Sequence, residues 1–446
     1  MSLSNGDISH LLLAFALLLV AAHGLGQLFA RFNQPRVAGE IVGGLLLGPT
    51  LFGLLLPDAH RAIFETGRAT QAGLAIAYQL GLLLLMYCSG AELRSIITRS
   101  ERRSTVAIAV LGNAVPFLAG IAFLRLYDTG RFLGPARDRT SFALVFALAM
   151  AVTSIPVISR IMADLGILRT RFARIVLSVA VLEDVCVYVV LNIALALVAP
   201  HAATAFGLPG LLGIESSGAV GSAYYVVVTL GFFALPALLG PGLVQKLSDL
   251  PHNVLYRSSP IAFQLVMLFA LSAFASFLGV SPIFGALVAG ILAGDLHGDS
   301  AQAKQTIRKH SYAFFIPLYF AVVGLRLDLV HRFDLVFFVF FLLFACLVKS
   351  ISSYLGARMT GESHHGARNL AVALNARGGP GIVLASVAYD ARIIDERFYS
   401  ILIMLALVTS VIAGSWLGAI LRRGEPLLAT DEQSEVAEAE SSGRPR

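Results

Sequence analysis

Apolar residues in this chain are gathered into blocks of about twenty, and the charged residues fall in short gaps between them. A helix of roughly 20 apolar residues crosses a bilayer core, so blocks of this length predict membrane helices. Charged residues make up 13% of the chain and hydrophobic residues 57%, whereas a soluble domain carries about 25% charged residues. A soluble enzyme, a nucleic-acid-binding protein and a secreted disulfide scaffold are excluded. The net charge of +6 is typical of loops that face an anionic inner leaflet.

We predict an all-α polytopic membrane protein with about 13 transmembrane helices. The predicted spans are 9–30, 36–56, 71–92, 104–126, 140–163, 173–199, 218–243, 259–279, 281–296, 311–326, 334–357, 367–389 and 398–421. No gap can hold a soluble domain, so residues 1–421 form one transmembrane domain. Residues 422–446 are polar and acidic, which predicts a disordered cytoplasmic tail. With the N-terminus outside, the inside loops carry about twice as many Lys and Arg residues as the outside loops.

The three cysteines lie inside apolar blocks and have no CxxC spacing. They are Cys88, Cys186 and Cys346. Free cysteines in such surroundings are usually small core residues. We therefore predict core positions for all three, and neither a disulfide nor a resident metal site.

A glycine pattern in the second predicted span recurs in the ninth. Residues 39–48 align without gaps to residues 285–294, with glycines matching at the first, sixth and tenth positions. Small residues at these spacings let helices pack closely in lipid. Because the two spans are an odd number of spans apart, the copies insert in opposite orientations. This predicts inverted-topology repeats, from which many secondary transporters are built.

The same offset pairs the fifth span with the twelfth, and both spans contain helix breakers in mid-membrane. The helix-breaking residues are Ser154, Pro156, Gly378, Gly379 and Pro380. Proline removes a backbone donor and clashes with the preceding turn, and glycine favours unwinding. A single proline in a membrane helix is usually only a kink. Two interrupted helices at matching places in two halves predict a binding site.

Four ionisable residues fall near the middle of predicted spans, where charges are costly and by default functional. They are Glu183 and Asp184 in the sixth span, Lys349 in the eleventh and Arg377 in the twelfth. Neighbouring helix positions point about 100° apart, so one carboxylate can face an ion cavity while the other meets Lys349. The alternative is that two acids and two bases only pair as buried salt bridges, although desolvation makes such pairs poor stabilisers.

A buried carboxylate beside a second acid can exchange a proton in the physiological range. Beside helix dipoles and unwound carbonyl groups, the same oxygen atoms can bind a desolvated monovalent cation. An acid that holds either a proton or a cation, and never both, is the site that an exchanger needs. The sequence therefore predicts cation–proton exchange.

In order and spacing, these motifs resemble the second family of monovalent cation–proton antiporters, which includes the membrane domain of glutathione-gated potassium efflux proteins. The resemblance covers about residues 9–421, and the matching stretches are 34–49, 153–156, 161–168, 183–184, 323–328, 349 and 375–378. It implies a sodium–proton antiporter fold with two crossed broken helices. It also implies a secondary active transporter that exchanges Na⁺ or K⁺ for H⁺ by alternating access, at one carboxylate site shared competitively by cation and proton.

By this likeness, Asp184 is the ion- and proton-carrying aspartate, and Thr153 and Asn375 help to line the cation site. Lys349 matches the lysine that pairs with the site when no cation is bound, and Arg377 is a second charge partner. Glu183 stands where this family commonly has Asp or Asn. Whether Glu183 is a second ligand of the cation or only pairs with Lys349 stays open. The Gly-Gly-Pro run at 378–380 also departs from the acidic or bulkier residues of the family.

The likeness further implies a homodimer in the plasma membrane of a prokaryote, with a role in pH homeostasis. Core helices at about 104–199 and 334–421 move against a dimerisation panel at about 9–92 and 218–326. Only some 25 residues follow the last predicted span, so we expect no attached nucleotide-binding domain, and no cofactor besides the transported ions.

Two other classes of protein are weighed against the exchanger. A gated potassium efflux channel without proton coupling shares every motif quoted and stays open. Intramembrane aspartyl and rhomboid-type serine proteases lack their sequence motifs here, so we expect no enzymatic activity.

Overall fold

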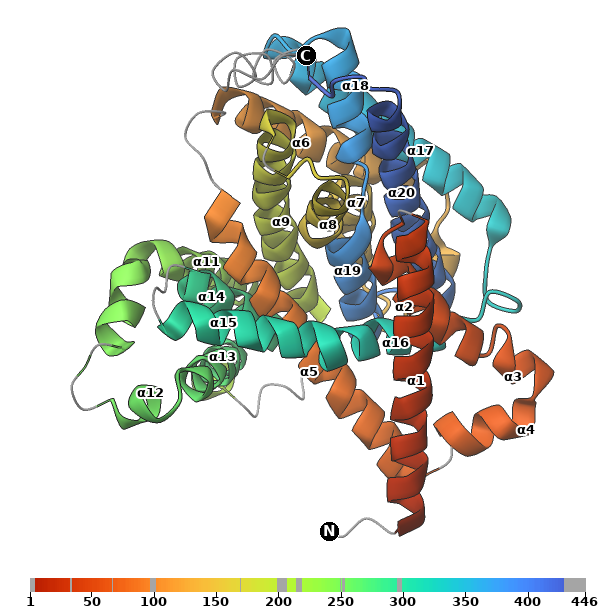
Figure 1. Cartoon of the computed structure of the whole chain (residues 1–446), viewed down its shortest axis with the longest axis vertical. Helices are drawn as coiled ribbons and strands as arrows, with labels where there is room; N and C mark the ends of the chain where they lie inside the picture. The colour runs from red at the N-terminus through yellow and green to blue at the C-terminus, as the bar shows by residue number, and fades with distance from the viewer. Residues whose placement is uncertain are drawn as a thin grey trace, which may run out of the picture. The chain divides into compact units, whose positions relative to one another are not determined.

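The computed structural model describes residues 5–32, 34–65, 67–96, 102–168, 170–198, 207–213, 219–248, 250, 253–294 and 299–428. Regular structure in these residues is helical (Figure 1). Among them, β-type pairing is confined to one isolated antiparallel bridge between Leu133 and Ile394. The chain divides into two compact units, which are described separately.

The first unit comprises Met1–Leu28, Gly39–Ser95 and Tyr188–Arg332. It holds most of α1 (Asn5–Arg31) and α2 (Arg36–Leu47), together with α3 (Phe52–Leu55), α4 (Pro57–His60), α5 (Arg68–Ile96), α10 (Leu208–Leu211), α11 (Ala219–Ser248), α12 (Val254–Ser258), α13 (Pro260–Phe277), α14 (Pro282–Gly294), α15 (Asp299–His310) and α16 (Ile316–Leu325). Two π-helical turns, η1 (Arg61–Glu65) and η5 (Ser311–Phe315), follow α4 and join α15 to α16.

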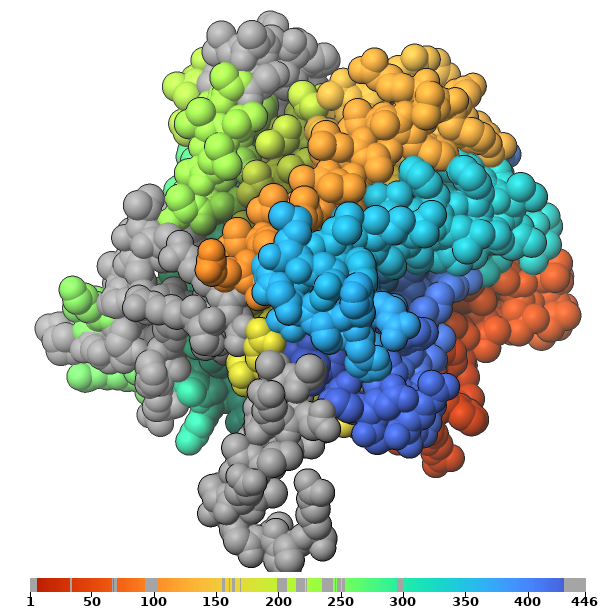
Figure 2. Space-filling view, turned by 90° about the horizontal axis from the view of Figure 1, so that it is seen from above, coloured from red at the N-terminus to blue at the C-terminus, as the bar shows by residue number. Residues whose placement is uncertain are grey.

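The second unit comprises Phe29–Ala38, Ile96–Val187 and Phe333–Arg446. It holds α6 (Arg102–Leu126), the 3₁₀ turn η3 (Gly130–Phe132), α7 (Arg139–Ala151), α8 (Ile155–Asp164), most of α9 (Arg171–Val198), α17 (Leu335–Met359), α18 (His364–Ala373), α19 (Gly378–Asp390) and α20 (Glu396–Arg422). α6 packs along α17, and their orange and cyan surfaces adjoin in Figure 2.

Polar residues mark where several helices of the second unit begin. Each accepts a hydrogen bond, through its side chain, from the backbone N–H three residues further on. These N-cap residues are Asp138 of α7, Asp334 of α17, Ser363 of α18 and Asp395 of α20. The first N–H groups of a helix have no partner within it, so such caps fix its start.

Nine helices among the described residues are long and apolar enough to cross a bilayer. Shorter apolar helices cover Arg139–Ala151, Ala223–Ala234 and Pro282–Gly294. Each predicted span contains helix in the structure, which confirms the all-α polytopic class. The count of about 13 spans stays a prediction.

The glycine repeat lies at matching helix crossings within the first unit. A Cβ built on Gly44 of α2 would overlap the carbonyl oxygen of Ala321 in α16, and one on Gly290 of α14 would overlap that of Tyr87 in α5. In the same way, α2 meets α1 at one glycine of the pattern and α14 meets α13 at its counterpart. The partner helices are themselves seven predicted spans apart. The packing therefore repeats with the offset seen in the sequence, as inverted repeats require.

Gly44→Ala is expected to destabilise the protein by about 1–3 kcal/mol, because the added methyl group overpacks a crossing of two backbones. The neighbouring atom is the carbonyl of Ala321, which cannot turn away as a flexible side chain could. Thermal unfolding of the detergent-purified protein measures the loss. Gly24→Ala is the matched control, because nothing lies within 4 Å of a Cβ at Gly24. Equal stability of the two variants would contradict the close crossing.

Two predictions about the chain are wrong in detail. The segment before the tenth predicted span is helical and not a loop, since α15 carries Lys304, Arg308 and Lys309 and continues through η5 into α16. Its polarity hides this helix from a search for apolar spans. Cys186 is exposed, whereas Cys88 is buried and Cys346 half-buried. Because lipid is itself apolar, a residue in an apolar block need not face the protein core.

Candidate functional site

The two predicted helix breaks lie in the second unit and are hydrogen-bonded to each other. Residues 152–154 separate α7 from α8, and residues 374–377 separate α18 from α19. The backbone N–H of Ser154 donates to the carbonyl oxygen of Ala376 at 2.7 Å. The two non-helical stretches therefore meet, which agrees with the crossed broken helices that the family resemblance implies.

Side chains from the first break cap helix ends on both sides of this crossing. The Thr153 hydroxyl donates to the carbonyl oxygen of Leu374, at the end of α18, at 2.6 Å. The Ser154 hydroxyl accepts from the N–H of Gly379 in α19 at 2.9 Å and from that of Val157 in α8 at 3.4 Å. Backbone groups in a bilayer core need partners from the protein, because lipid offers none. These bonds supply partners at three of the four interrupted ends.

The helix-breaking residues suit these positions. A Cβ on Gly378 would overlap the side chain of Val157, so glycine lets the start of α19 approach α8. Pro156 and Pro380 are the second and third residues of their helices. The first N–H groups of a helix have no partner within it, so proline is tolerated at both places.

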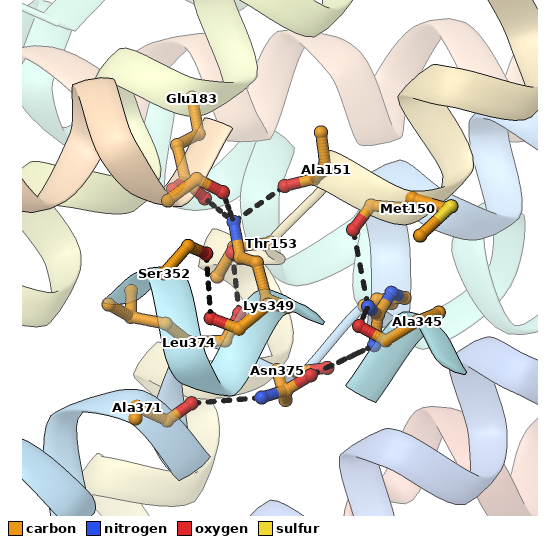
Figure 3. A network of polar contacts seen from close by, with 12 residues as sticks. Met150, Ala151, Thr153, Glu183, Ala345, Lys349, Ser352, Ala371, Leu374 and Asn375 are labelled. Carbon is orange, nitrogen blue, oxygen red and sulfur yellow. Dashed lines mark hydrogen bonds and ion pairs between the residues drawn. The ribbon is translucent and has the colours of Figure 1, made fainter. Parts of the chain in front are cut away.

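Lys349 is fully buried in α17, and its ammonium group has three acceptors (Figure 3). It donates to Glu183 Oε2 at 2.8 Å, to the carbonyl oxygen of Gly112 in α6 at 2.8 Å and to that of Ala151, the last residue of α7, at 2.6 Å. An ammonium group has three N–H donors, so none is left for a further acceptor. Of the two adjacent acids, Glu183 is thus the partner of Lys349.

Asp184 follows Glu183 on α9 and is 1% exposed. Its Oδ1 atom has no hydrogen-bond partner from the described part of the chain. A buried carboxylate without a donor or a counter-charge is costly. A bound proton or a cation would remove that cost. Carboxylate oxygens suit hard cations, which prefer oxygen ligands.

Among the described residues, the Arg377 side chain binds oxygen atoms of carbonyl groups and the sulfur of Cys346, and no carboxylate. The guanidinium donates to the backbone carbonyls of Ala149, Met150, Ala345 and Asn375 at 3.2, 3.2, 3.0 and 3.3 Å, and to the side-chain oxygen of Asn375 at 3.2 Å. The C-terminal end of a helix is electronegative. Arg377 and Lys349 together place two cations at the C-terminal end of α7. The pattern of four residues in two salt bridges is therefore not what the structure shows.

Asn375 holds the second break against α17 and α18. Its amide nitrogen donates to the Ser350 hydroxyl at 2.8 Å and to the carbonyl oxygen of Ala371 at 3.0 Å. Its amide oxygen accepts from Arg377. The structure thus brings Asn375 and Thr153 to the same crossing, where each already takes part in hydrogen bonds.

Some groups that form hydrogen bonds at the site are not among the residues predicted from the sequence. The carbonyls of Gly112 and Ala151 accept from Lys349, and the Thr409 hydroxyl accepts from the backbone N–H of Arg377 at 3.3 Å. A backbone carbonyl carries no side-chain signal in a sequence. The serines that follow Lys349 at 350, 352 and 353 do carry one, because polar residues inside an apolar span are unusual.

Ser154→Ala is expected to lower the free energy of unfolding by about 1–3 kcal/mol, because it leaves the N–H groups of Gly379 and Val157 without an acceptor. Thermal unfolding in detergent measures this. Ser400→Ala is the control, because Ser400 is buried and its hydroxyl has no partner among the described residues. An equal effect of both substitutions would show that the Ser154 cap does not stabilise the crossing.

Comparisons with known proteins agree with this geometry. A family model described as sodium/hydrogen exchanger, transmembrane, matches residues 14–423. The K(+)/H(+) antiporter 1 of Saccharomyces cerevisiae is 28% identical over 427 residues, which are 92% of this chain and 46% of the relative. The Na(+)/H(+) antiporter NhaS4 of Synechocystis is 28% identical over 418 residues, which are 91% of this chain and 96% of the relative. The chain thus spans about half the length of the first relative and nearly all of the second.

A comparison with solved structures supports the same fold. The sodium proton antiporter MjNhaP1 from Methanocaldococcus jannaschii superposes with a TM-score of 0.61 at 15% identity, over 93% of this chain and 98% of that one. This likeness confirms the predicted sodium–proton antiporter fold. Because the family model covers nearly the whole described chain, the chain belongs to the transmembrane sodium/hydrogen exchanger family.

Proposed function

We propose that this chain is a secondary active transporter that exchanges Na⁺ or K⁺ for protons across a membrane. The observation that carries the proposal is the buried Asp184, whose Oδ1 lacks a partner in the described chain and whose neighbour Glu183 is paired with Lys349. The names of the two relatives, a K(+)/H(+) antiporter and a Na(+)/H(+) antiporter, support exchange over a channel without coupling.

The competition of proton and cation follows from the hydrogen bonds around Asp184. All three donors of Lys349 are engaged elsewhere, so the Oδ1 atom of an ionised Asp184 would be buried without a hydrogen-bond donor from the described residues. This arrangement therefore favours the protonated acid. Loss of the proton creates a carboxylate that needs a cation. Both ligands use the same oxygen atoms, so binding of one requires release of the other.

Glu183 links cation binding to Lys349. Glu183 lies next to Asp184 on α9, so a cation on the ionised Asp184 would attract the Glu183 carboxylate in competition with the ammonium group. The pair of Glu183 and Lys349 would loosen, and the freed carboxylate could become a second ligand. In this proposal Thr153 and Asn375 offer further oxygen atoms at the crossing.

We also propose how the protein works as an assembly. The core helices at 104–199 and 334–421 move against the panel at 9–92 and 218–326, and two chains form a dimer through the panel. The second compact unit supports this division, because every hydrogen bond described at the candidate site lies within it. We place the chain in the plasma membrane of a prokaryote, and the bias of basic residues supports an external N-terminus and a cytoplasmic C-terminus there.

Reconstitution into liposomes tests the proposed exchange. Purified protein is inserted into vesicles that contain a pH-sensitive dye, and a proton gradient is imposed. Addition of Na⁺ or K⁺ is expected to dissipate the gradient, whereas choline is not. Tracer cation flux without proton counterflux would contradict the proposal and favour a channel. Repeating the assay at clamped membrane potentials shows whether exchange moves net charge.

A further inference from the structure

The chain turns sharply after α20. Gly424 has a left-handed backbone with φ of +71°, and its N–H donates to the carbonyl oxygen of Leu421 at 3.0 Å. The N–H of Glu425 donates to the carbonyl oxygen of Ile420 at 3.3 Å. These two bonds and the left-handed glycine form a Schellman motif, which ends a helix. Residues 424–428, the docked segment, therefore leave the axis of α20.

The docked segment packs against α18 in the same compact unit. Leu428 is fully buried and Leu427 is 3% exposed. A Cβ built on Gly366 would lie 2.8 Å from Leu428 Cδ2, so glycine lets this leucine lie directly on the helix. The Asn369 amide nitrogen donates to the carbonyl oxygen of Leu427 at 3.0 Å. Gly366 and Asn369 are three residues apart, so the docked segment contacts one face of α18.

Asn369 joins the docked segment to α18 and α20 at once. It is 1% exposed, and its amide oxygen accepts from Trp416 Nε1 in α20 at 3.2 Å. Hydrophobic contact is non-directional, whereas a hydrogen bond requires a narrow range of distance and angle. The two leucine side chains therefore hold the docked segment on α18, and Asn369 fixes where α18 lies.

The other end of α18 reaches the crossing of the two helix breaks. The carbonyl oxygen of Ala371 accepts from the Asn375 amide. The carbonyl oxygen of Leu374 accepts from the Thr153 hydroxyl. α18 has only 10 residues, and both acceptors follow Asn369 within about a turn and a half. A helix this short moves as a unit, so a shift at Asn369 displaces the groups at the crossing.

We propose that the docked segment positions α18 and thereby sets the affinity of the crossing for the transported cation. This inference rests on the proposed exchange function. Asn369 and Leu428 are positioning residues, because they act on the crossing through α18. Coupling between two sites is reciprocal, so cation binding at the crossing also changes the contacts of the docked segment.

A segment that only stabilised the fold would give a different result. Loss of folded protein lowers the amount of active transporter and so the maximal rate of exchange. The cation KM of the molecules that remain folded would not change. A displaced α18 instead raises the cation KM, because the groups that line the site no longer lie where the ion needs them.

Exchange in liposomes, measured against cation concentration, separates these two roles. Leu428→Asp puts a charge into an apolar contact, and Asn369→Ala removes two hydrogen bonds. Each is expected to raise the cation KM about 5–10-fold, which is the equivalent of one buried hydrogen bond. Leu428→Met keeps the apolar volume and should keep the wild-type KM. Asp395→Ala is the control for stability, because it removes the N-cap at the other end of α20 and should leave the KM in place.

The fluorescence of Trp416 tests the coupling without transport. The chain has one tryptophan, and this residue binds Asn369, so its emission reports on the contacts of the docked segment. Adding Na⁺ or K⁺ to the detergent-purified protein is expected to change the emission, with a midpoint near the KM. In Asp184→Asn the change should be lost.

The inference is overturned if Leu428→Asp and Asn369→Ala both keep the wild-type KM, or if neither cation changes the emission of Trp416. Emission that follows the cation concentration in a wild-type protein without exchange would instead refute the proposed function, and would support the coupling.

Discussion

Asp184→Asn is expected to abolish cation–proton exchange and to leave the protein folded. Asparagine has nearly the shape of a protonated aspartate, but it can neither release a proton nor offer a carboxylate to a cation. Asp184 Oδ1 has no partner among the described residues, so the substitution breaks no hydrogen bond at that atom. Exchange should fall by at least about 100-fold, whereas stability should change by no more than about 0.5 kcal/mol.

Proton flux in liposomes and thermal unfolding in detergent measure the two halves of this prediction. Asp390→Asn is the matched control, because Asp390 lies exposed at the end of α19 in the same compact unit. Full activity in Asp184→Asn would refute Asp184 as the site of exchange. A loss of activity together with a loss of folding would show that Asp184 holds the structure together, and would equally contradict the proposal.

Lys349→Ala is expected to lower the free energy of unfolding by about 3–5 kcal/mol, because removing one partner of a buried ion pair leaves the other charge alone. Here the remaining charge is Glu183, and the carbonyls of Gly112 and Ala151 lose their donor as well. All of these groups lie inside the second compact unit.

A double-mutant cycle separates the charge from the lost packing. Adding Glu183→Gln to Lys349→Ala removes the unpaired charge and should recover part of the stability, with a coupling of about 1–3 kcal/mol. Thermal unfolding of the two single variants and the double variant gives this value. Strictly additive effects would show that Glu183 and Lys349 do not depend on each other.

The helices and their interruptions could be predicted because their signals are local. Apolar length predicts a span, and the proline and glycine residues near Ser154 and Gly378 predict the breaks. α15 shows the limit of this reasoning, since a helix that is polar along much of its length has no apolar signal. Cys186 shows another limit, because hydropathy does not say which side of a span faces lipid.

The hydrogen-bond partners of the site residues were harder to predict than the site residues themselves. Glu183, Asp184, Lys349 and Arg377 stand out as charges in apolar spans. Which acid meets Lys349 depends on the rotation of α9 about its axis, and neighbouring residues differ there by about 100°. Three of the backbone carbonyls that bind Arg377 lie far away in the sequence and belong to alanine and methionine residues. Backbone acceptors of this kind leave no trace in composition or spacing.

The hydrogen bonds between the two helix breaks hold the crossing together as one rigid part. Sliding α8 past α19 would break the bonds of Thr153 and Ser154 at once, in surroundings that offer no replacement. The four helix ends must therefore travel together. An ion bound there would move together with its binding site, and the shape of that site would not change. Access would switch because first one side and then the other side of this rigid part would become open.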